Sequence, residues 1–188
     1  MVLVLLVNMK LGNLEFVPVK EKLDLVGETI KKSIETNNLS GILVAEIDAG
    51  LADTAAFCEH YNIGLDVSAN CVVVEAKRAD KVWYAACLIL ATTRADINGI
   101  VRKQLEAKKL SFAPMDKAVA LSNMEFGGIT PIGLPSDWPL LIDSAVAESE
   151  RLVVGSGIRK SKLLVPGKLF NSLPNTEIMS LTKSSTDA

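Results

Sequence analysis

The sequence predicts an α+β fold in which a mixed, largely antiparallel sheet curls around a core and is surrounded by helices. Three observations favour this class. Short apolar runs typical of strands are interspersed with amphipathic helix patterns, without the sustained alternation of a parallel α/β protein. Hydrophobic residues make up 49% of the 188 residues, enough for one globular domain with a real core. No internal repeat or linker divides the chain, so we expect a single domain over residues 1–188.

The N-terminal part, residues 1–40, is expected to be an extension followed by one helix. The run Met1–Val7 is too short to span a bilayer and lacks the basic start and cleavage site of a secretory signal. It is either a buried strand or a translated extension, with Met9 as an alternative start. Pro18 suits the first position of a helix that ends at Asn37–Asn38. The apolar residues that recur at helical spacing are Val19, Leu23, Val26, Ile30 and Ile34.

The next elements are a strand, a helix and a hairpin. Residues Gly41–Ile47 read as a short buried strand, and Asp53–Tyr61 as a helix stopped by Gly64. The β-branched run Cys71–Val74 and the longer apolar run Val82–Thr92 flank a polar turn at residues 78–80. We therefore expect an antiparallel hairpin here.

The remaining elements are short. Asp96 can cap a helix whose apolar side consists of Ile97, Ile100, Val101 and Leu105. Its basic residues, Arg102, Lys103, Lys108 and Lys109, are interpreted as a solvated face. The further expected elements are a helix at Met115–Leu121, strands at Leu140–Asp143, Leu152–Val154 and Leu163–Val165, and a terminal helix at Leu169–Leu173. The tail from Thr182 is polar and is expected to fray.

Composition narrows the classes of function. The charges nearly balance, with 20 basic and 22 acidic residues, so extensive wrapping by nucleic acid is not expected. Aromatic residues are 5%, too few for a single-strand-binding platform. The cysteines Cys58, Cys71 and Cys87 are scattered and His60 is the sole histidine, so we expect no metal and no cofactor. We interpret the cysteines as reduced in a cytoplasmic protein, and expect no membrane segment.

The segment Gly127–Pro135 is the most informative stretch. It holds three glycines and two prolines in nine residues, which excludes a helix or a central strand. We expect a stiff loop with outward backbone N–H and C=O groups that could hold an anion, a ribose or a small polar group. The alternative is a surface turn between two strands.

Four stretches carry a resemblance to a known family. Gly128–Gly133 matches the family's loop of glycine, two residues, proline, one residue and glycine. Leu141–Asp143 resembles its strand ending in aspartate, Val154–Arg159 its late glycine-bearing strand, and Asp53–Ala56 its Thr/Ala-rich helix. Over residues 41–173 the chain resembles the YbaK-like family. These are freestanding aminoacyl-tRNA editing proteins related to the editing domain inserted in bacterial prolyl-tRNA synthetases.

The resemblance implies a hydrolase that acts in trans on the ester of a mischarged tRNA. Its partners would be the acceptor end of aminoacyl-tRNA and, as a further candidate, a tRNA synthetase. For Arg102, Lys103, Lys108 and Lys109, the alternative to a solvated face is a weak contact with tRNA phosphates. In the family, main-chain groups and the substrate's own hydroxyl position the attacking water. The residues implied to shape the pocket are Gly127, Gly128, Thr130, Pro131 and Gly133. Gly155 and Gly157 would allow close approach of a neighbouring strand, and Asp143 would bind the substrate amine or support the loop.

The chain departs from the family at one functional position. Asn70 stands where the family has a lysine, and it can donate a hydrogen bond but has no charge. Lys77 or Lys81 could serve instead if the alignment is shifted. Otherwise Asn70 is a neutral donor to the oxyanion, or hydrolysis has been lost. Cys71 is expected on the opposite face of the strand from Asn70 and is not favoured as a nucleophile.

Two functions of different class therefore remain open. One is a trans-acting aminoacyl-tRNA deacylase in which Asn70 and Asp143 are the candidate catalytic residues. The other is a non-catalytic module that binds an aminoacyl-adenosine-like or nucleotide-like ligand. A third reading makes the apolar loop, with Trp138–Pro139, the interface of a homodimer. The sequence does not identify the amino acid, the tRNA or the choice between monomer and homodimer.

Overall fold

The computed structural model describes residues 7–182 of the chain. The expectations for Met1–Val7 and for the tail from Thr182 concern mainly residues 1–6 and 183–188, which lie outside this range.

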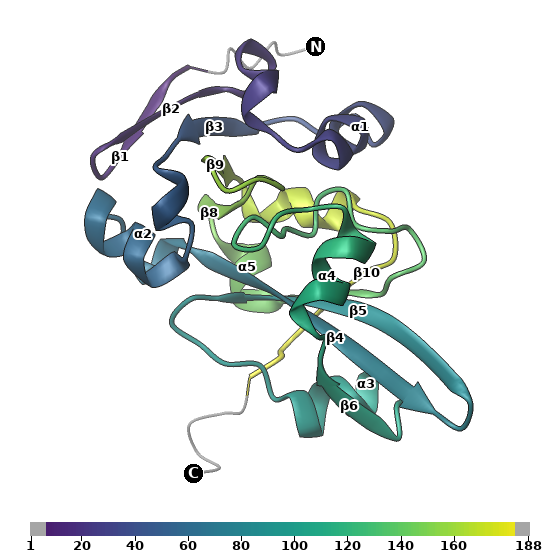
Figure 1. Ribbon diagram of the computed structural model, residues 1–188. Helices are drawn as coiled ribbons and strands as arrows, with labels where there is room; N and C mark the ends of the chain where they lie inside the picture. The colour runs from purple at the N-terminus through teal and green to yellow at the C-terminus, as the bar shows by residue number, and fades with distance from the viewer. Residues whose placement is uncertain (1–6, 183–188) are drawn as a thin grey trace.

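Ten strands form two five-stranded sheets within the described residues (Figure 1). The first sheet is antiparallel and has the order β1 (Met9–Leu11), β2 (Leu14–Pro18), β3 (Leu43–Glu46), β9 (Ser161–Val165) and β8 (Leu152–Gly155). The second has the order β10 (Thr176–Met179), β7 (Leu140–Asp143), β5 (Lys81–Leu90), β4 (Ala69–Arg78) and β6 (Lys109–Phe112). In it β7 pairs in parallel with both β5 and β10, and the other pairs are antiparallel. The predicted α+β class, with mixed and largely antiparallel pairing, is confirmed.

Short helices surround the sheets. The α-helices are α1 (Glu28–Thr36), α2 (Thr54–Tyr61), α3 (Arg102–Gln104), α4 (Met115–Ser122) and α5 (Ser144–Glu148). A π-helical turn, η5 (Ile97–Val101), precedes α3. The 3-10 turns are η1 (Val19–Glu21), η2 (Leu23–Leu25), η3 (Ala49–Leu51), η4 (Leu65–Val67) and η6 (Gly167–Ser172). The β4–β5 hairpin extends away from the first sheet toward the end of the molecule that carries β6 and α3 (Figure 1). No helix within residues 7–182 is long and apolar enough to cross a membrane.

The predicted helix from Pro18 begins ten residues later than expected. Pro18 ends β2, and residues 19–25 form the turns η1 and η2. The backbone N–H of Val19 donates to Ile42 O at 3.1 Å, and that of Gly27 to Ser156 O at 2.8 Å. These long-range hydrogen bonds hold the segment against other parts of the chain and override its helical spacing. Gly27, with extended backbone, then precedes α1.

Several other elements differ from the prediction in their ends or their type, or were not predicted. Helix α2 ends at Tyr61 as expected, but Asn62, which adopts a left-handed conformation with φ 53°, caps it in place of Gly64. The helix after Asp96 ends at Gln104, because residues 109–112 form β6 and pair with β4. The terminal helix is the 3-10 turn η6. The strands β1, β2, β6 and β10 and the helix α5 were not predicted, because each is short and is defined mainly by its partners.

The largest group of buried apolar side chains belongs to both sheets. Val44 and Leu163 come from the first sheet, and Leu88 and Ile142 from the second. A parallel bridge between Ser68 and Val153 also joins the residue before β4 to β8. The start of β4 is thereby placed beside β8, and a cavity opens there.

Candidate functional site

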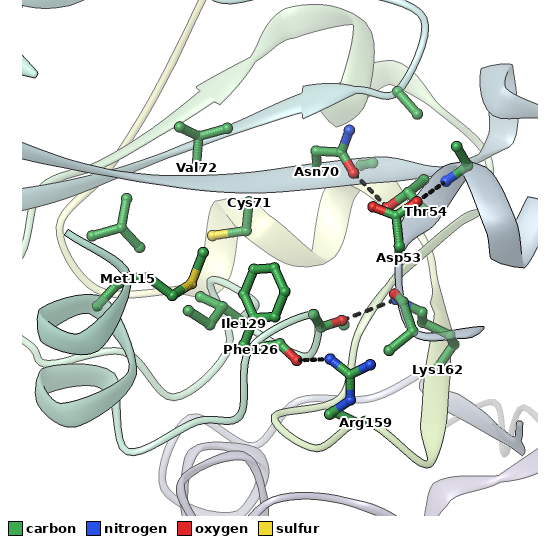
Figure 2. A pocket seen from close by; sticks show the side chains of 18 of the residues that line it. Asp53, Thr54, Asn70, Cys71, Val72, Met115, Phe126, Ile129, Arg159 and Lys162 are labelled. Carbon is green, nitrogen blue, oxygen red and sulfur yellow. Dashed lines mark hydrogen bonds between the residues drawn. The ribbon is translucent and has the colours of Figure 1, made fainter. Parts of the chain in front are cut away.

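A cavity of about 680 Å³ lies between the start of β4, the first turn of α2, α4, the Gly/Pro loop and β9 (Figure 2). Asn70 and Cys71 contribute from β4, and Lys162 and Arg159 from the opposite side. The complete lining is Ala52, Asp53, Thr54, Ala55, Leu65, Ala69, Asn70, Cys71, Val72, Val73, Ala91, Phe112, Ala113, Met115, Ala118, Phe126, Gly127, Ile129, Gly155, Arg159 and Lys162. The surface is therefore mostly apolar with a few polar groups, as expected of a small-molecule site.

The first turn of α2 is fixed to the start of β4. Asp53 caps the helix, because its Oδ1 accepts hydrogen bonds from the N–H groups of Ala55 and Ala56 at 3.1 and 3.3 Å. Thr54 then donates its hydroxyl proton to Asn70 Oδ1 at 2.6 Å. The Asn70 side chain is half-buried at the cavity and oriented by this bond. It thus presents an oriented, neutral amide where the family resemblance implies a lysine.

Lys162 is a cationic residue of the cavity that sequence analysis missed. It lies on β9 with 5% of its surface exposed. Its Nζ donates to Ala52 O at 2.7 Å and to Gly127 O at 3.1 Å, so it connects the segment before α2 with the Gly/Pro loop. Burial lowers the pKa of Lys162 to about 8, which leaves the amine mostly protonated at neutral pH. The available signal was a lysine within the apolar run Ser161–Val165, since lysine is almost never buried unless it is paired.

Arg159 holds the loop from the same side of the cavity. Its Nε donates to Ala49 O at 3.1 Å, and its guanidinium donates to Phe126 O at 2.9 Å. The guanidinium also lies 5.9 Å from the centre of the Phe126 ring. The Arg159 N–H donates to Glu125 Oε2 at 2.6 Å. Together with Lys162, Arg159 fixes residues 125–127 at the mouth of the cavity.

The loop approaches the β8–β9 connection closely, and glycine permits the approach. Gly128 O accepts from Gly157 N at 2.7 Å. A Cβ added at Gly128 would lie 2.7 Å from Ile158 O, and one added at Gly155 would lie 2.7 Å from Ile129 O. Gly127 adopts φ +80°, which disfavours residues with a side chain. These glycines shape the wall between the loop and β8.

The other predicted loop residues lie away from this cavity. Pro131 and Gly133 line a second hollow of about 470 Å³ on the side facing α1. Thr130 is fully buried, and its hydroxyl has no hydrogen-bond partner among residues 7–182. Gly157, with φ +83°, packs against Gly27. Of the predicted binding residues, Gly127 and Gly155 therefore line the cavity, and Gly128 supports it.

Asp143 is buried outside the cavity and binds backbone groups. It is 4% exposed and does not line the cavity. Its Oδ1 accepts from Ala145 N at 3.0 Å and caps α5, and its Oδ2 accepts from Leu181 N at 2.8 Å. Both carboxylate oxygens thus bind backbone of α5 and of Leu181, and neither binds the Gly/Pro loop.

Lys77 and Lys81, the two candidates to replace the missing lysine, lie far from the cavity. Lys77 lies near the other end of β4 and binds Glu75 Oε1 at 2.7 Å, and Lys81 begins β5 beyond the hairpin turn. Cys71 extends from the opposite side of β4 to Asn70, as expected, and it also lines the cavity (Figure 2). Burial raises the pKa of the Cys71 thiol, so it stays protonated and is a poor nucleophile.

Two remaining residues from the sequence analysis are accounted for by packing. His60 is exposed at the end of α2 and packs edge-on against Tyr61. Trp138 is 5% exposed and stacks on Tyr84, with ring centres 5.5 Å apart, so it is not offered to a second subunit. Within residues 7–182 no three His, Cys, Asp or Glu side chains are grouped so that they could hold a metal ion.

Comparisons with known proteins cover the segment that forms the cavity. A family model described as "Aminoacyl-tRNA editing domain" matches residues 48–171, a segment that contains every lining residue of the cavity. No curated protein matches the sequence.

Two solved structures share the fold. One is described as a "putative trans-editing enzyme for prolyl tRNA synthetase"; it has 14% sequence identity and a TM-score of 0.70, with 85% of this chain and 99% of that chain covered. The other is a hypothetical protein with 15% identity and a TM-score of 0.72, with 83% and 100% of the two chains covered. At these identities the likeness concerns the fold alone.

Proposed function

The chain belongs to the aminoacyl-tRNA editing domain family, and from this premise we propose that it is a trans-acting deacylase that hydrolyses the ester of a mischarged tRNA. The observation that carries the proposal is the cavity itself. It lies wholly within the segment matched by the family model, and a buried lysine, Lys162, joins its two sides. The proposed substrate is the aminoacyl end of a tRNA.

The proposed reaction is the hydrolysis of an ester. Water adds to the ester carbonyl, the bond between the acyl carbon and the ribose oxygen breaks, and the ribose oxygen takes a proton. The products are the free amino acid and the tRNA with its terminal hydroxyl restored. Negative charge develops on the carbonyl oxygen during the addition, so a hydrogen-bond donor aimed at that oxygen accelerates the step.

Lys162 and Asn70 are the proposed donors. The Lys162 ammonium has three protons, and two of them bind Ala52 O and Gly127 O. We assign the third to the ester carbonyl oxygen. The Asn70 oxygen accepts from Thr54, which leaves its amide N–H groups to donate to the substrate. A charge supplied from β9 would therefore replace the lysine that the family resemblance implies on β4.

The small apolar part of the cavity supports a role in discrimination between amino acids. A synthetase gains only about 1–3 kcal/mol from one methylene, so a smaller amino acid can be attached in error. Cys71, Val72, Ala118 and Ile129 line the cavity and can contact a short aliphatic side chain. Such a protein would act in the cytoplasm, where tRNA is charged, either alone or beside a synthetase.

The proposal is tested with a panel of mischarged tRNAs carrying small amino acids. We expect release of the amino acid from at least one of them above the rate in buffer, measured with radiolabelled aminoacyl ester. Hydrolysis of none would rule out the deacylase and favour the non-catalytic binding module, which the neutral Asn70 supports.

Asn70→Ala tests the proposed role of Asn70 as a hydrogen-bond donor to the ester. We expect kcat/KM to fall about 10- to 100-fold, because one donor to the oxyanion is lost. Glu59→Ala serves as a control for folding, since Glu59 is an exposed residue of α2 outside the cavity. An Asn70→Ala protein that keeps full activity would show that Asn70 does not contact the reacting ester.

A further inference from the structure

Six basic residues gather at the end of the molecule away from the cavity. We call this group the basic tip: Lys77, Arg78, Arg102, Lys103, Lys108 and Lys109. Lys77 lies opposite Lys109 in the sheet, and the Lys108 N–H donates to Lys77 O at 2.8 Å. Two hollows of about 460 and 610 Å³ open here and share Arg102 and Lys108. All six residues are exposed, although they come from β4, α3, β6 and the turn before β6.

Acidic neighbours balance only part of this charge. Lys77 binds Glu75 at 2.7 Å, and Arg78 binds Glu106 at 3.3 Å. Within residues 7–182, Arg102, Lys103, Lys108 and Lys109 form no ion pair. The whole chain has a net charge of −2, so the tip is a local concentration and does not reflect a basic protein. Like charges held together repel one another, and an anionic partner would relieve that repulsion.

We propose that the basic tip binds the phosphate backbone of the substrate RNA while the RNA's aminoacylated end occupies the cavity. This inference rests on the proposed function. Strand β4 connects the two places, because Asn70 lines the cavity and Lys77 belongs to the tip. Seven residues of strand at about 3.3 Å each separate them by about 23 Å. A nucleic-acid duplex carries a phosphate charge for about every 1.7 Å of its axis, so an acceptor stem leaving the cavity would bring several phosphates to the tip.

The chemistry of the tip favours RNA over a protein partner. Protein interfaces are typically apolar at their centre, with aromatic residues enriched and lysine depleted. Lysine and arginine dominate both hollows, whose apolar lining is limited to Leu110 and Ala107. Lysine and arginine contacts to phosphate position a nucleic acid without reading its sequence. The tip would therefore set the direction of the RNA and leave recognition of the aminoacyl group to the cavity.

The test measures RNA binding as a function of salt. The probes are a fluorescently labelled RNA hairpin with a single-stranded CCA end and the CCA trinucleotide alone. We expect Lys103→Gln/Lys108→Gln to weaken binding of the hairpin and to lower the slope of log K against log salt by about two, since each phosphate contact contributes about one. Binding of the trinucleotide should not change, because it does not reach the tip.

The matched control is Lys20→Gln/Lys22→Gln, which removes the same charge from two exposed lysines that follow β2 of the first sheet. It should leave the slope unchanged. Two results would overturn the proposal. One is a salt slope in the tip variant equal to that of the wild type, which would favour an acidic protein as the partner of the tip. The other is an equal loss of slope in the control variant. Failure of the proposed function is distinguishable, because a protein without hydrolytic activity would still bind the hairpin in a tip-dependent manner.

Discussion

Lys162 combines two properties that usually exclude one another: it is buried and it is charged. Removing an ammonium from water is costly, and the protein compensates it with two backbone carbonyls and no carboxylate hydrogen bond. The incomplete compensation explains why the pKa of Lys162 is lowered to about 8. A residue held in this state changes its charge within the range of pH in which enzymes are assayed.

We predict that hydrolysis depends on the charged form of Lys162. The rate above buffer should fall as pH rises through about 8, because the ammonium is the donor and exists below that pKa. Lys162→Met should lower kcat/KM about 100-fold, as expected for loss of one oxyanion donor. Lys162→Arg should retain activity and lose the alkaline decline, since arginine stays protonated. The measurement is a pH profile of single-turnover deacylation.

Stability provides the control for this profile. The folded pKa of Lys162 lies below its unfolded value of 10.5, so the folded state releases its proton first. The contribution of Lys162 to the free energy of unfolding must therefore increase between pH 8 and 10.5. An alkaline loss of activity cannot then be attributed to unfolding caused by this residue. A flat wild-type profile across pH 8 would refute the proposed role.

At the scale of elements, the Gly/Pro loop was predicted from its residues, but its surroundings were not. Glycine and proline exclude regular structure locally, and this exclusion identified the loop. The partners of the loop come from Ala52, Arg159 and Lys162, which are distant in sequence. No local pattern encodes such contacts. For the same reason Asp143 was found but its binding to Leu181 N was not.

The contact between the loop and the β8–β9 connection gives a prediction at this scale. In Gly128→Ala the added Cβ would lie 2.7–2.8 Å from the backbone of Ile158, so one segment must shift. We expect a loss of about 1–3 kcal/mol in the free energy of unfolding, measured with urea. Hydrolysis should also fall, because Gly127 and Ile129 line the cavity.

Gly50→Ala is the matched control, since its Cβ would meet only the Asp48 carboxylate, with the nearest atom at 3.2 Å. Equal stability of the two variants would mean that the loop can move away from β8 without cost.

At the scale of the whole molecule, the two sheets share one core. The class and most element types could be predicted, because apolar periodicity reports which residues are buried. The division into two sheets could not, since it depends on which strands pair. Strand β9, for example, lies between β3 and β8, and its pairing brings Lys162 to the cavity. The prediction of a single domain remains open to experiment.

We predict that the two sheets unfold together. Leu163 is a fully buried residue of the first sheet, whereas both tryptophans lie at the second, Trp83 in β5 and Trp138 against Tyr84. Leu163→Ala should lower the free energy of unfolding by about 2–5 kcal/mol. The transition seen by tryptophan fluorescence should shift as much as that seen by circular dichroism. Leu121→Ala, at an exposed position of α4, should change neither.

A fluorescence transition whose midpoint does not change in Leu163→Ala would instead show that the two sheets unfold independently.

The position of β10 has a consequence for synthesis of the protein. Strand β10 pairs with β7, and Asp143 at the end of β7 binds the backbone of Leu181, 38 residues later. Translation at about 5–20 residues per second leaves that edge of β7 without its partner for about 2–8 s. During this interval a growing chain offers an unpaired apolar strand to its neighbours on the polysome. Chaperones that shield such edges would therefore matter most in the interval between synthesis of β7 and synthesis of β10.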